Sequence, residues 1–170
     1  MAAVQSQLIP FNPAFHTDAK AQEDAEKLYK AGEGKWGTDE ETFIKILFSS
    51  PPQYFEMLNA WYAKKYNNTI HVAVKKEFGG DAEKALLYFV GVSLDPYKTF
   101  AEHAESTMKG VGTDELGLSA ALVRFRPFLQ EVSKEYQRIY SKSLKDRVKG
   151  ETSGDYRALL VGLLDSPANA

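Results

Sequence analysis

The chain has 170 residues, 44% of them hydrophobic, which suffices for one compact domain or two small ones with a real core. It contains no cysteine, which excludes disulfides, thiolate metal sites and cysteine nucleophiles. Its formal net charge of -2 is spread without long blocks of one sign, which argues against nucleic acid as a partner. No stretch is apolar enough to cross a membrane and the first residues lack the features of a secretory signal, so we expect a soluble, cytoplasmic protein.

Residues 1–16 contain apolar side chains, among them Phe11 and Phe15, but no regular spacing, so we expect an extended N-terminal tail or linker. Beyond residue 16, apolar residues such as Phe43 and Leu47 recur three and four positions apart, which is the helical period. Glycines, prolines and asparagines interrupt this pattern at short intervals. The pattern predicts helices over residues 18–31, 38–49, 52–66, 69–77 and 81–92.

The second half of the chain repeats the first. The segment that begins at Trp36 aligns with the segment that begins at Val111, 75 residues later. Further along, the offset falls to 74, because one residue is missing before Pro127. The repeated pattern predicts helices over residues 96–109, 113–124, 127–140, 143–149 and 154–164. The sequence therefore indicates an all-α protein of two five-helix repeats, over residues 17–93 and 94–170.

A Gly-Thr-Asp-Glu sequence follows the first helix of each repeat. Thr38 and Glu41 have the spacing of a capping box, which satisfies unpaired backbone N–H groups at a helix start. In the second repeat Thr113 is followed by Leu116, so only half of that motif remains. Capping alone accounts for the motif, and a further role needs a second observation.

That second observation is a carboxylate at a fixed distance. Glu77 follows Gly37 by 40 residues and Glu151 follows Gly112 by 39, each beside a glycine-containing turn. Calcium takes about six to eight oxygen ligands and accepts backbone carbonyls, which a glycine-rich loop can supply. A site with one carboxylate binds weakly, at about 10⁻⁴ to 10⁻³ M, and lipid phosphate can replace its remaining water ligands.

These motifs resemble those of the annexin family, whose repeats have five helices, a glycine-rich loop after the first helix and an acidic residue before the fifth. The strings AGEGKWGTDEETF, MKGVGTDE and KGETSGDYRALL carry the resemblance, which covers residues 18–166. They are most similar to the third and fourth repeats of a four-repeat annexin. The resemblance implies two annexin-type repeats packed in a right-handed superhelical arrangement.

The family's calcium ligands fall on two sets of residues in this sequence. The resemblance implies carbonyl ligands and one carboxylate in each repeat: Gly32, Lys35, Gly37 and Glu77 in the first, Met108, Gly110, Gly112 and Glu151 in the second. Membrane contact is expected from Lys35, Trp36 and Val111, because tryptophan is enriched at membrane interfaces. The alternative for Trp36 is that its ring folds inward.

Two departures from the family pattern bear on these sites. Phe78 and the glycine after it replace the more usual Thr-Ser that follows Glu151, which puts minor ligands near Phe78 in doubt. The residue missing before Pro127 is either absorbed between two helices or displaces Glu151, and we expect the loop to absorb it.

Signals for other functions are weak. Residues 32–37 match a G-x-G-x-x-G pattern, but a helix and not a strand precedes them, so dinucleotide binding is not expected. The histidines, His16, His71 and His103, are scattered and form no zinc-ligand spacing. No nucleophile with a base or pair of catalytic carboxylates is recognisable, so we do not expect an enzyme.

The leading hypothesis is a calcium-dependent protein that binds acidic phospholipid membranes, lies peripherally on them when calcium rises, and scaffolds or bridges them. The alternative is a structural or cytoskeleton-associated annexin-like protein with weak or vestigial calcium sites, which Phe78 and the missing residue slightly favour. Two origins of a two-repeat chain stay open. Either two chains pair as a homodimer that rebuilds a four-repeat disc, or the sequence is half of a longer protein.

Overall fold

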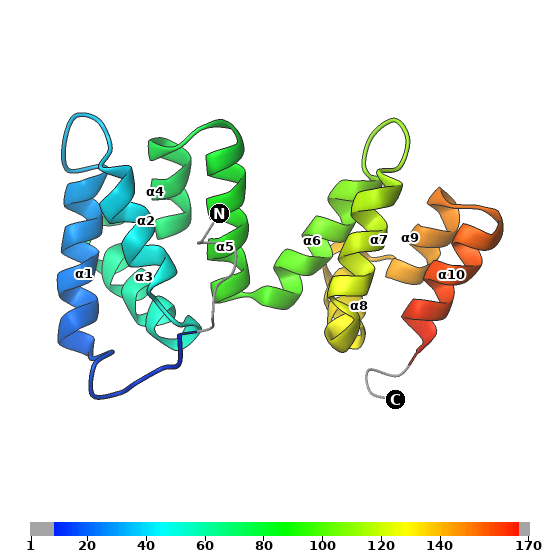
Figure 1. Cartoon of the computed structure of the whole chain (residues 1–170), viewed down its shortest axis with the longest axis horizontal. Helices are drawn as coiled ribbons and strands as arrows, with labels where there is room; N and C mark the ends of the chain where they lie inside the picture. Colours follow the sequence, from blue (N-terminus) through cyan, green and yellow to red (C-terminus); the bar gives the residue numbers. More distant parts are fainter. Residues whose placement is uncertain (1–8, 167–170) are drawn as a thin grey trace. The chain divides into compact units, whose positions relative to one another are not determined.

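A computed structural model describes residues 9–166 of the chain. Within this range all regular structure is helical, and the chain divides after Leu94 into two compact units (Figure 1). This confirms the predicted fold class of an all-α protein with two five-helix repeats. The superhelical packing of one repeat on the other stays a prediction. None of the described helices is long and apolar enough to cross a membrane.

The first unit contains five α-helices whose ends follow local capping rules. Thr17 and Thr69 accept hydrogen bonds from backbone N–H groups at the starts of α1 and α4. Asn67 ends α3 in the left-handed conformation that asparagine tolerates. The helices are α1 Asp18–Ala31, α2 Glu40–Phe48, α3 Pro52–Tyr66, α4 Ile70–Glu77 and α5 Gly80–Leu94.

The second unit repeats this order with one change. Its helices are α6 Pro96–Met108, α7 Glu115–Arg124, the short 3₁₀ helix η2 Arg126–Phe128, α8 Leu129–Tyr140, α9 Leu144–Glu151 and α10 Gly154–Asp165. The predicted helix start at residue 127 is wrong, because the 3₁₀ turn replaces the first turn of the α-helix there. This turn lies between α7 and α8, the connection in which the sequence of the second repeat is one residue shorter.

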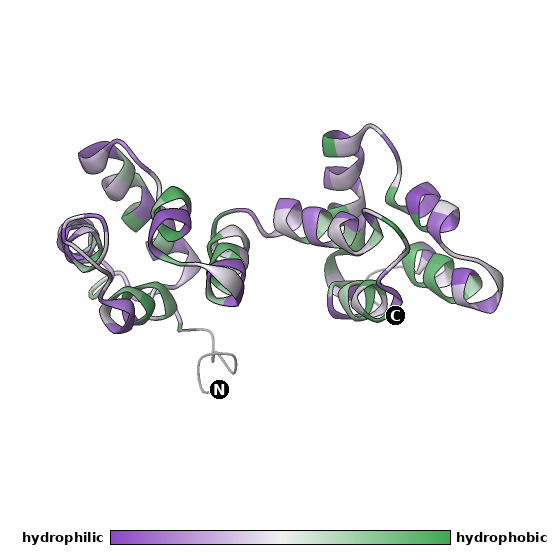
Figure 2. Ribbon diagram, turned by 90° about the horizontal axis from the view of Figure 1, so that it is seen from above, coloured by the Kyte–Doolittle hydropathy of each residue, from purple (hydrophilic) through white to green (hydrophobic). Residues whose placement is uncertain are grey.

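Each unit is held together by apolar side chains on the inner faces of its helices. In the first unit, Leu28, Phe43 and Leu58 are fully buried in one cluster. In the second, Leu118 and Leu144 are equally buried. Burial of each such side chain contributes about 1.5–3 kcal/mol, which outweighs the weak helix propensity of short segments. Figure 2 shows that helices of both units carry apolar and polar residues together.

The described part of the N-terminal segment is not the extended tail that we expected. The N–H groups of Phe15 and His16 donate to the carbonyl of Asn12, which makes a turn. The ring of His16 is buried 4.9 Å from that of Tyr54 on α3, so this turn packs on the first unit. The rest of the predicted tail, residues 1–8, lies outside the described residues.

Candidate functional site

Two loops hold most of the backbone carbonyls expected to bind calcium: loop 1, residues 32–39 between α1 and α2, and loop 2, residues 109–114 between α6 and α7. The other expected ligands, Glu77, Met108 and Glu151, are the last residues of α4, α6 and α9. One backbone hydrogen bond closes each loop at its base, from Asp39 N–H to the Ala31 carbonyl at 2.6 Å and from Asp114 N–H to the Thr107 carbonyl at 2.8 Å. Within its own unit, loop 1 lies at the same end as the turn between α4 and α5 (Figure 1).

The capping box predicted at Thr38 is wrong. The N-cap of α2 is Asp39, whose side chain accepts from the N–H of Thr42 at 3.1 Å. In the second unit Asp114 caps α7 in the same way. Helices α2 and α7 therefore begin two residues later than predicted, and the threonine of each motif is left for another partner.

That partner is the carboxylate predicted as a calcium ligand. The hydroxyl of Thr38 donates to Oε2 of Glu77 at 2.5 Å, across 39 residues of sequence. Thr113 makes the corresponding contact with Oε2 of Glu151 at 3.3 Å. The structure thus brings each loop into contact with its carboxylate. The second repeat keeps this contact although it is one residue shorter than the first.

The backbone of loop 1 at Gly32 lies close to the side chain of Glu77. A Cβ atom on Gly32 would lie 2.9 Å from Cγ of Glu77, so only glycine lets the backbone approach this side chain without a shift. The Gly32 carbonyl accepts from the N–H of Lys35 at 3.1 Å and keeps a second lone pair. A carboxylate and carbonyls are hard oxygen donors, so the residues of loop 1 fit calcium.

The exposed part of loop 1 depends on a glycine backbone. Gly37 has a φ of 78° and Gly112, at the same position of loop 2, has a φ of 85°. These values lie in the left-handed region, which costs other residues about 1–2 kcal/mol. Lys35 and Gly37 are exposed, as are the corresponding residues of loop 2, Gly110 and Gly112.

Trp36 and Val111 stand at the tips of the two loops. Their exposed fractions are 104% and 110%, which means that no described part of the chain covers either side chain. The inward-folded alternative for Trp36 is therefore wrong. A fully exposed indole costs free energy in water, and it suits a surface that makes contact with something apolar.

Loop 2 differs from loop 1 because an arginine on α9 forms hydrogen bonds with two of the predicted calcium ligands of the second repeat. Nη2 of Arg147 donates to the Met108 carbonyl at 2.6 Å, and Nη1 donates to the carboxylate of Glu151. Both oxygens belong to the predicted ligand set. While the guanidinium pairs with both oxygens, neither is free to bind a calcium ion, so loop 2 fits the ion only after Arg147 moves away.

The described residues contain no group of three or more histidine, cysteine, aspartate or glutamate side chains that could hold a metal ion. This agrees with a donor set built mainly from backbone carbonyls. The departure at Phe78 has a structural role, because this side chain is buried with its ring 5.2 Å from that of Phe43. It provides no oxygen ligand.

Comparison with known proteins decides the family. A family model described as annexin matches residues 23–89 and 99–163. The chain belongs to the annexin family. Both matched segments lie within the two repeats that the sequence indicated, so the resemblance to annexins is confirmed.

The chain spans a little less than half the length of the individual annexins that it matches. Annexin A13 of Homo sapiens is 41% identical over 145 residues, which is 85% of this chain and 46% of that protein. The solved structure of annexin III superposes with a TM-score of 0.84 at 32% identity, covering 88% of this chain and 47% of that one. A calcium-bound annexin (Sm)1 gives 0.77 at 28% identity, covering 88% and 41%. These relatives support calcium-dependent phospholipid binding at the level of the family.

Each annexin repeat also holds a glutamate that the sequence did not single out. Glu33 accepts from Tyr62 and pairs with Lys76 at 2.6 Å, while Glu105 accepts from Tyr136. Burial alone would raise the pKa of Glu33, but hydrogen bonds from Lys76 and Tyr62 outweigh it and lower the pKa. The recurrence of the two tyrosines at an offset of 74 was the signal that could have revealed these partners.

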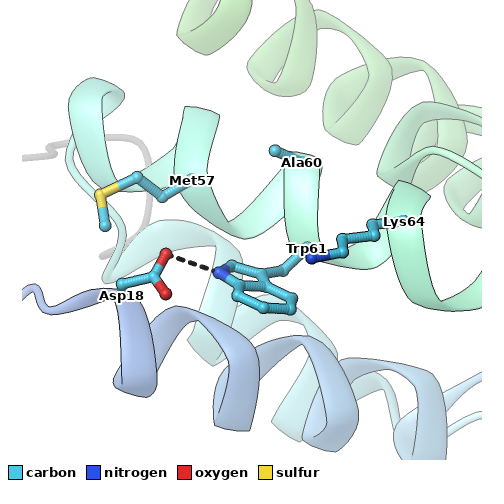
Figure 3. A pocket seen from close by; sticks show the side chains of 5 residues that line it. All are labelled: Asp18, Met57, Ala60, Trp61 and Lys64. Carbon is cyan, nitrogen blue, oxygen red and sulfur yellow. Dashed lines mark hydrogen bonds between the residues drawn. The ribbon is translucent and has the colours of Figure 1, made fainter.

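A small surface pocket in the first repeat is separate from the loops (Figure 3). It lies between α1 and α3, where Nε1 of Trp61 donates to Asp18 at 2.7 Å and Nζ of Lys64 stands 4.5 Å over the indole ring. Asp18 is the first residue of the 14-residue helix α1, so the pocket lies about 20 Å along that helix from loop 1. It contributes nothing to the candidate site.

Proposed function

We propose that this chain binds acidic phospholipid membranes through calcium held in loop 1. The observation that carries the proposal is the Glu77 side chain, which lies against Gly32 and accepts a hydrogen bond from Thr38, both in the loop that exposes Trp36. These residues come from two elements, loop 1 and the end of α4, which contact each other in the first repeat.

The residues of the proposed site divide into calcium ligands and a residue that positions one of them. The carbonyls of Gly32, Lys35 and Gly37 and the carboxylate of Glu77 hold the ion, which supplies the positive charge that attracts lipid phosphate. Thr38 keeps Glu77 in position by donating to one of its oxygens. Because one carboxylate does not neutralise a divalent ion, the site retains positive charge for an anionic headgroup.

Trp36 and Lys35 then extend the contact to the lipid itself. The indole has an apolar body and a polar N–H, a combination that is favourable at the boundary between headgroups and acyl chains. The lysine next to it adds attraction to anionic lipid of about 1 kcal/mol. Calcium and lipid binding would strengthen each other by the same factor, since both use the same loop.

Cosedimentation with phosphatidylserine vesicles over a calcium series tests this function. We expect the wild-type chain to pellet only with calcium, to be released by a chelator, and not to pellet with phosphatidylcholine. Glu77→Gln with Glu151→Gln keeps the side-chain shape but removes both charges, and should need at least about tenfold more calcium. Glu56→Gln, on the exposed surface of α3, is the matched control and should behave as wild type.

A second candidate is a structural or cytoskeleton-associated annexin that binds its partner without calcium. The pairing of Arg147 with Glu151 favours this candidate for the second repeat, because it removes an oxygen donor from loop 2. The same assay separates the candidates. A chain that fails to pellet with acidic vesicles at any calcium concentration supports the structural role.

A further inference from the structure

Helix α9 places a cation against the predicted calcium ligands of the second repeat. Arg147 lies four residues before Glu151 on α9, so both side chains project from the same face of the helix. Its guanidinium donates to the Glu151 carboxylate through Nη1 and to the Met108 carbonyl through Nη2. A positive charge therefore stands between two oxygens that calcium would need together.

Glu105 fixes the guanidinium in this position. Nε of Arg147 donates to Oε2 of Glu105 at 3.1 Å, and Nη2 donates to Oε1 at 3.2 Å. Such two-point pairing holds a guanidinium more firmly than a single contact. Tyr136 donates to the same carboxylate from α8. With 21% of the Arg147 side chain exposed, water screens these contacts only in part.

The first repeat provides an internal comparison. The residue four positions before Glu77 on α4 is Ala73, which is fully buried and uncharged. The nearby cation Lys76 pairs with Glu33 instead. Across residues 9–166, no lysine or arginine forms an ion pair with the Glu77 carboxylate. The two loops share a left-handed glycine at the same position, Gly37 and Gly112, but the charge that faces their carboxylates differs.

We propose that Arg147 is a built-in competitor for calcium, which weakens loop 2 and makes loop 1 the first to bind. This inference rests on the proposed function, because it concerns the same class of ion site. Calcium gains the oxygens of Met108 and Glu151 only when the guanidinium leaves both, and that step breaks charge-assisted hydrogen bonds. The two repeats therefore respond at different calcium concentrations.

An NMR titration of the ¹⁵N-labelled chain with calcium chloride, without lipid, tests the proposal. The amide signals of Gly37 and Gly112 report loop 1 and loop 2 separately. Arg147→Ala gives α9 the side chain that α4 has at the matching position. The half-saturating calcium concentration of loop 2 should fall by about tenfold or more, which corresponds to about 1.4 kcal/mol, while that of loop 1 stays unchanged.

Two further variants make the outcome decisive. Arg147→Ala leaves the Glu105 carboxylate without its cation, which can destabilise the fold. If the single variant does not fold, the double variant Arg147→Ala with Glu105→Gln is titrated in its place. Lys145→Ala is the matched control, because it deletes an ion pair between α9 and α10 that involves neither Glu151 nor a residue of either loop. It should leave the half-saturating calcium concentrations of both loops as they are.

Failure of this inference is distinct from failure of the proposed function. If the Gly112 signal of the folded arginine variants responds at the wild-type calcium concentration, Arg147 is no competitor and the inference is overturned. If the Gly37 signal of the wild-type chain does not respond to calcium, the proposed function of loop 1 is overturned instead.

Discussion

Gly32→Ala tests the geometry of loop 1 with a single methyl group. A Cβ atom here would lie 2.9 Å from Cγ and 3.1 Å from Cδ of Glu77, and 3.3 Å from the ring of Phe43. The φ of Gly32 is -122°, outside the left-handed region that disfavours side chains. The substitution therefore acts mainly by pushing the Glu77 side chain away from the loop.

The size of the effect follows from these distances. Ordinary contacts of a Cβ atom begin near 3.4 Å, so Glu77 must retreat by about 0.5 Å. Calcium holds carboxylate oxygens at about 2.3–2.6 Å, and such a retreat loosens that ligand. One charge-assisted contact is worth about 1.5–3 kcal/mol, which predicts a roughly tenfold to hundredfold rise in the calcium needed for vesicle binding.

Cosedimentation over a calcium series measures this rise, and urea unfolding shows whether the fold is retained. The free energy of unfolding should change by less than about 1.5 kcal/mol, because the half-buried Glu77 can move toward solvent. Gly79→Ala is the matched control, since a Cβ atom there meets nothing within 4 Å. A folded Gly32→Ala variant with the wild-type calcium requirement, or an equal effect of Gly79→Ala, would refute the geometry.

Two further predictions concern the loop tip and the pH dependence of stability. Trp36→Ala should weaken vesicle binding at saturating calcium by about 1–2 kcal/mol, whereas Trp61→Phe should not. In the Trp61→Phe background, brominated lipid should quench Trp36 fluorescence, and unquenched emission contradicts insertion. Burial alone would raise the pKa of Glu105, but hydrogen bonds from Arg147 and Tyr136 lower it below its ordinary value of 4.5. The ionised form therefore stabilises the fold above about pH 4.5, and this contribution is lost as pH falls through the folded pKa. Urea unfolding at about pH 7 and about pH 3.5 should show a smaller loss for Glu105→Gln than for wild type, and equal losses would contradict the assignment.

Periodicity was enough to predict the helices of both repeats, because each helix must bury one apolar stripe and polar turns separate them. It failed at the starts of α2 and α7. Thr38 and Asp39 are both good capping residues, and local sequence does not decide between them. Which of the two caps α2 depends on Glu77, which lies 39 residues away and accepts a hydrogen bond from the Thr38 hydroxyl.

The candidate site was predictable in loop 1 and only in part in loop 2. The repeated spacing from glycine to glutamate indicated that Glu77 and Glu151 lie beside their loops, and the structure places them there. Their roles as calcium ligands stay a prediction, as do the homodimer and the cytoskeletal partner. Arg147 was missed because its contact with Met108 joins two helices, and no spacing within the sequence reveals such a contact.

A crystal structure of the chain with calcium and a soluble phosphoserine headgroup tests the central claim most directly. We predict an ion in loop 1, about 2.3–2.6 Å from the carbonyls of Gly32, Lys35 and Gly37 and from the carboxylate of Glu77. The headgroup phosphate should complete its coordination. Loop 1 without an ion at saturating calcium, or an ion that does not contact Glu77, would contradict the account.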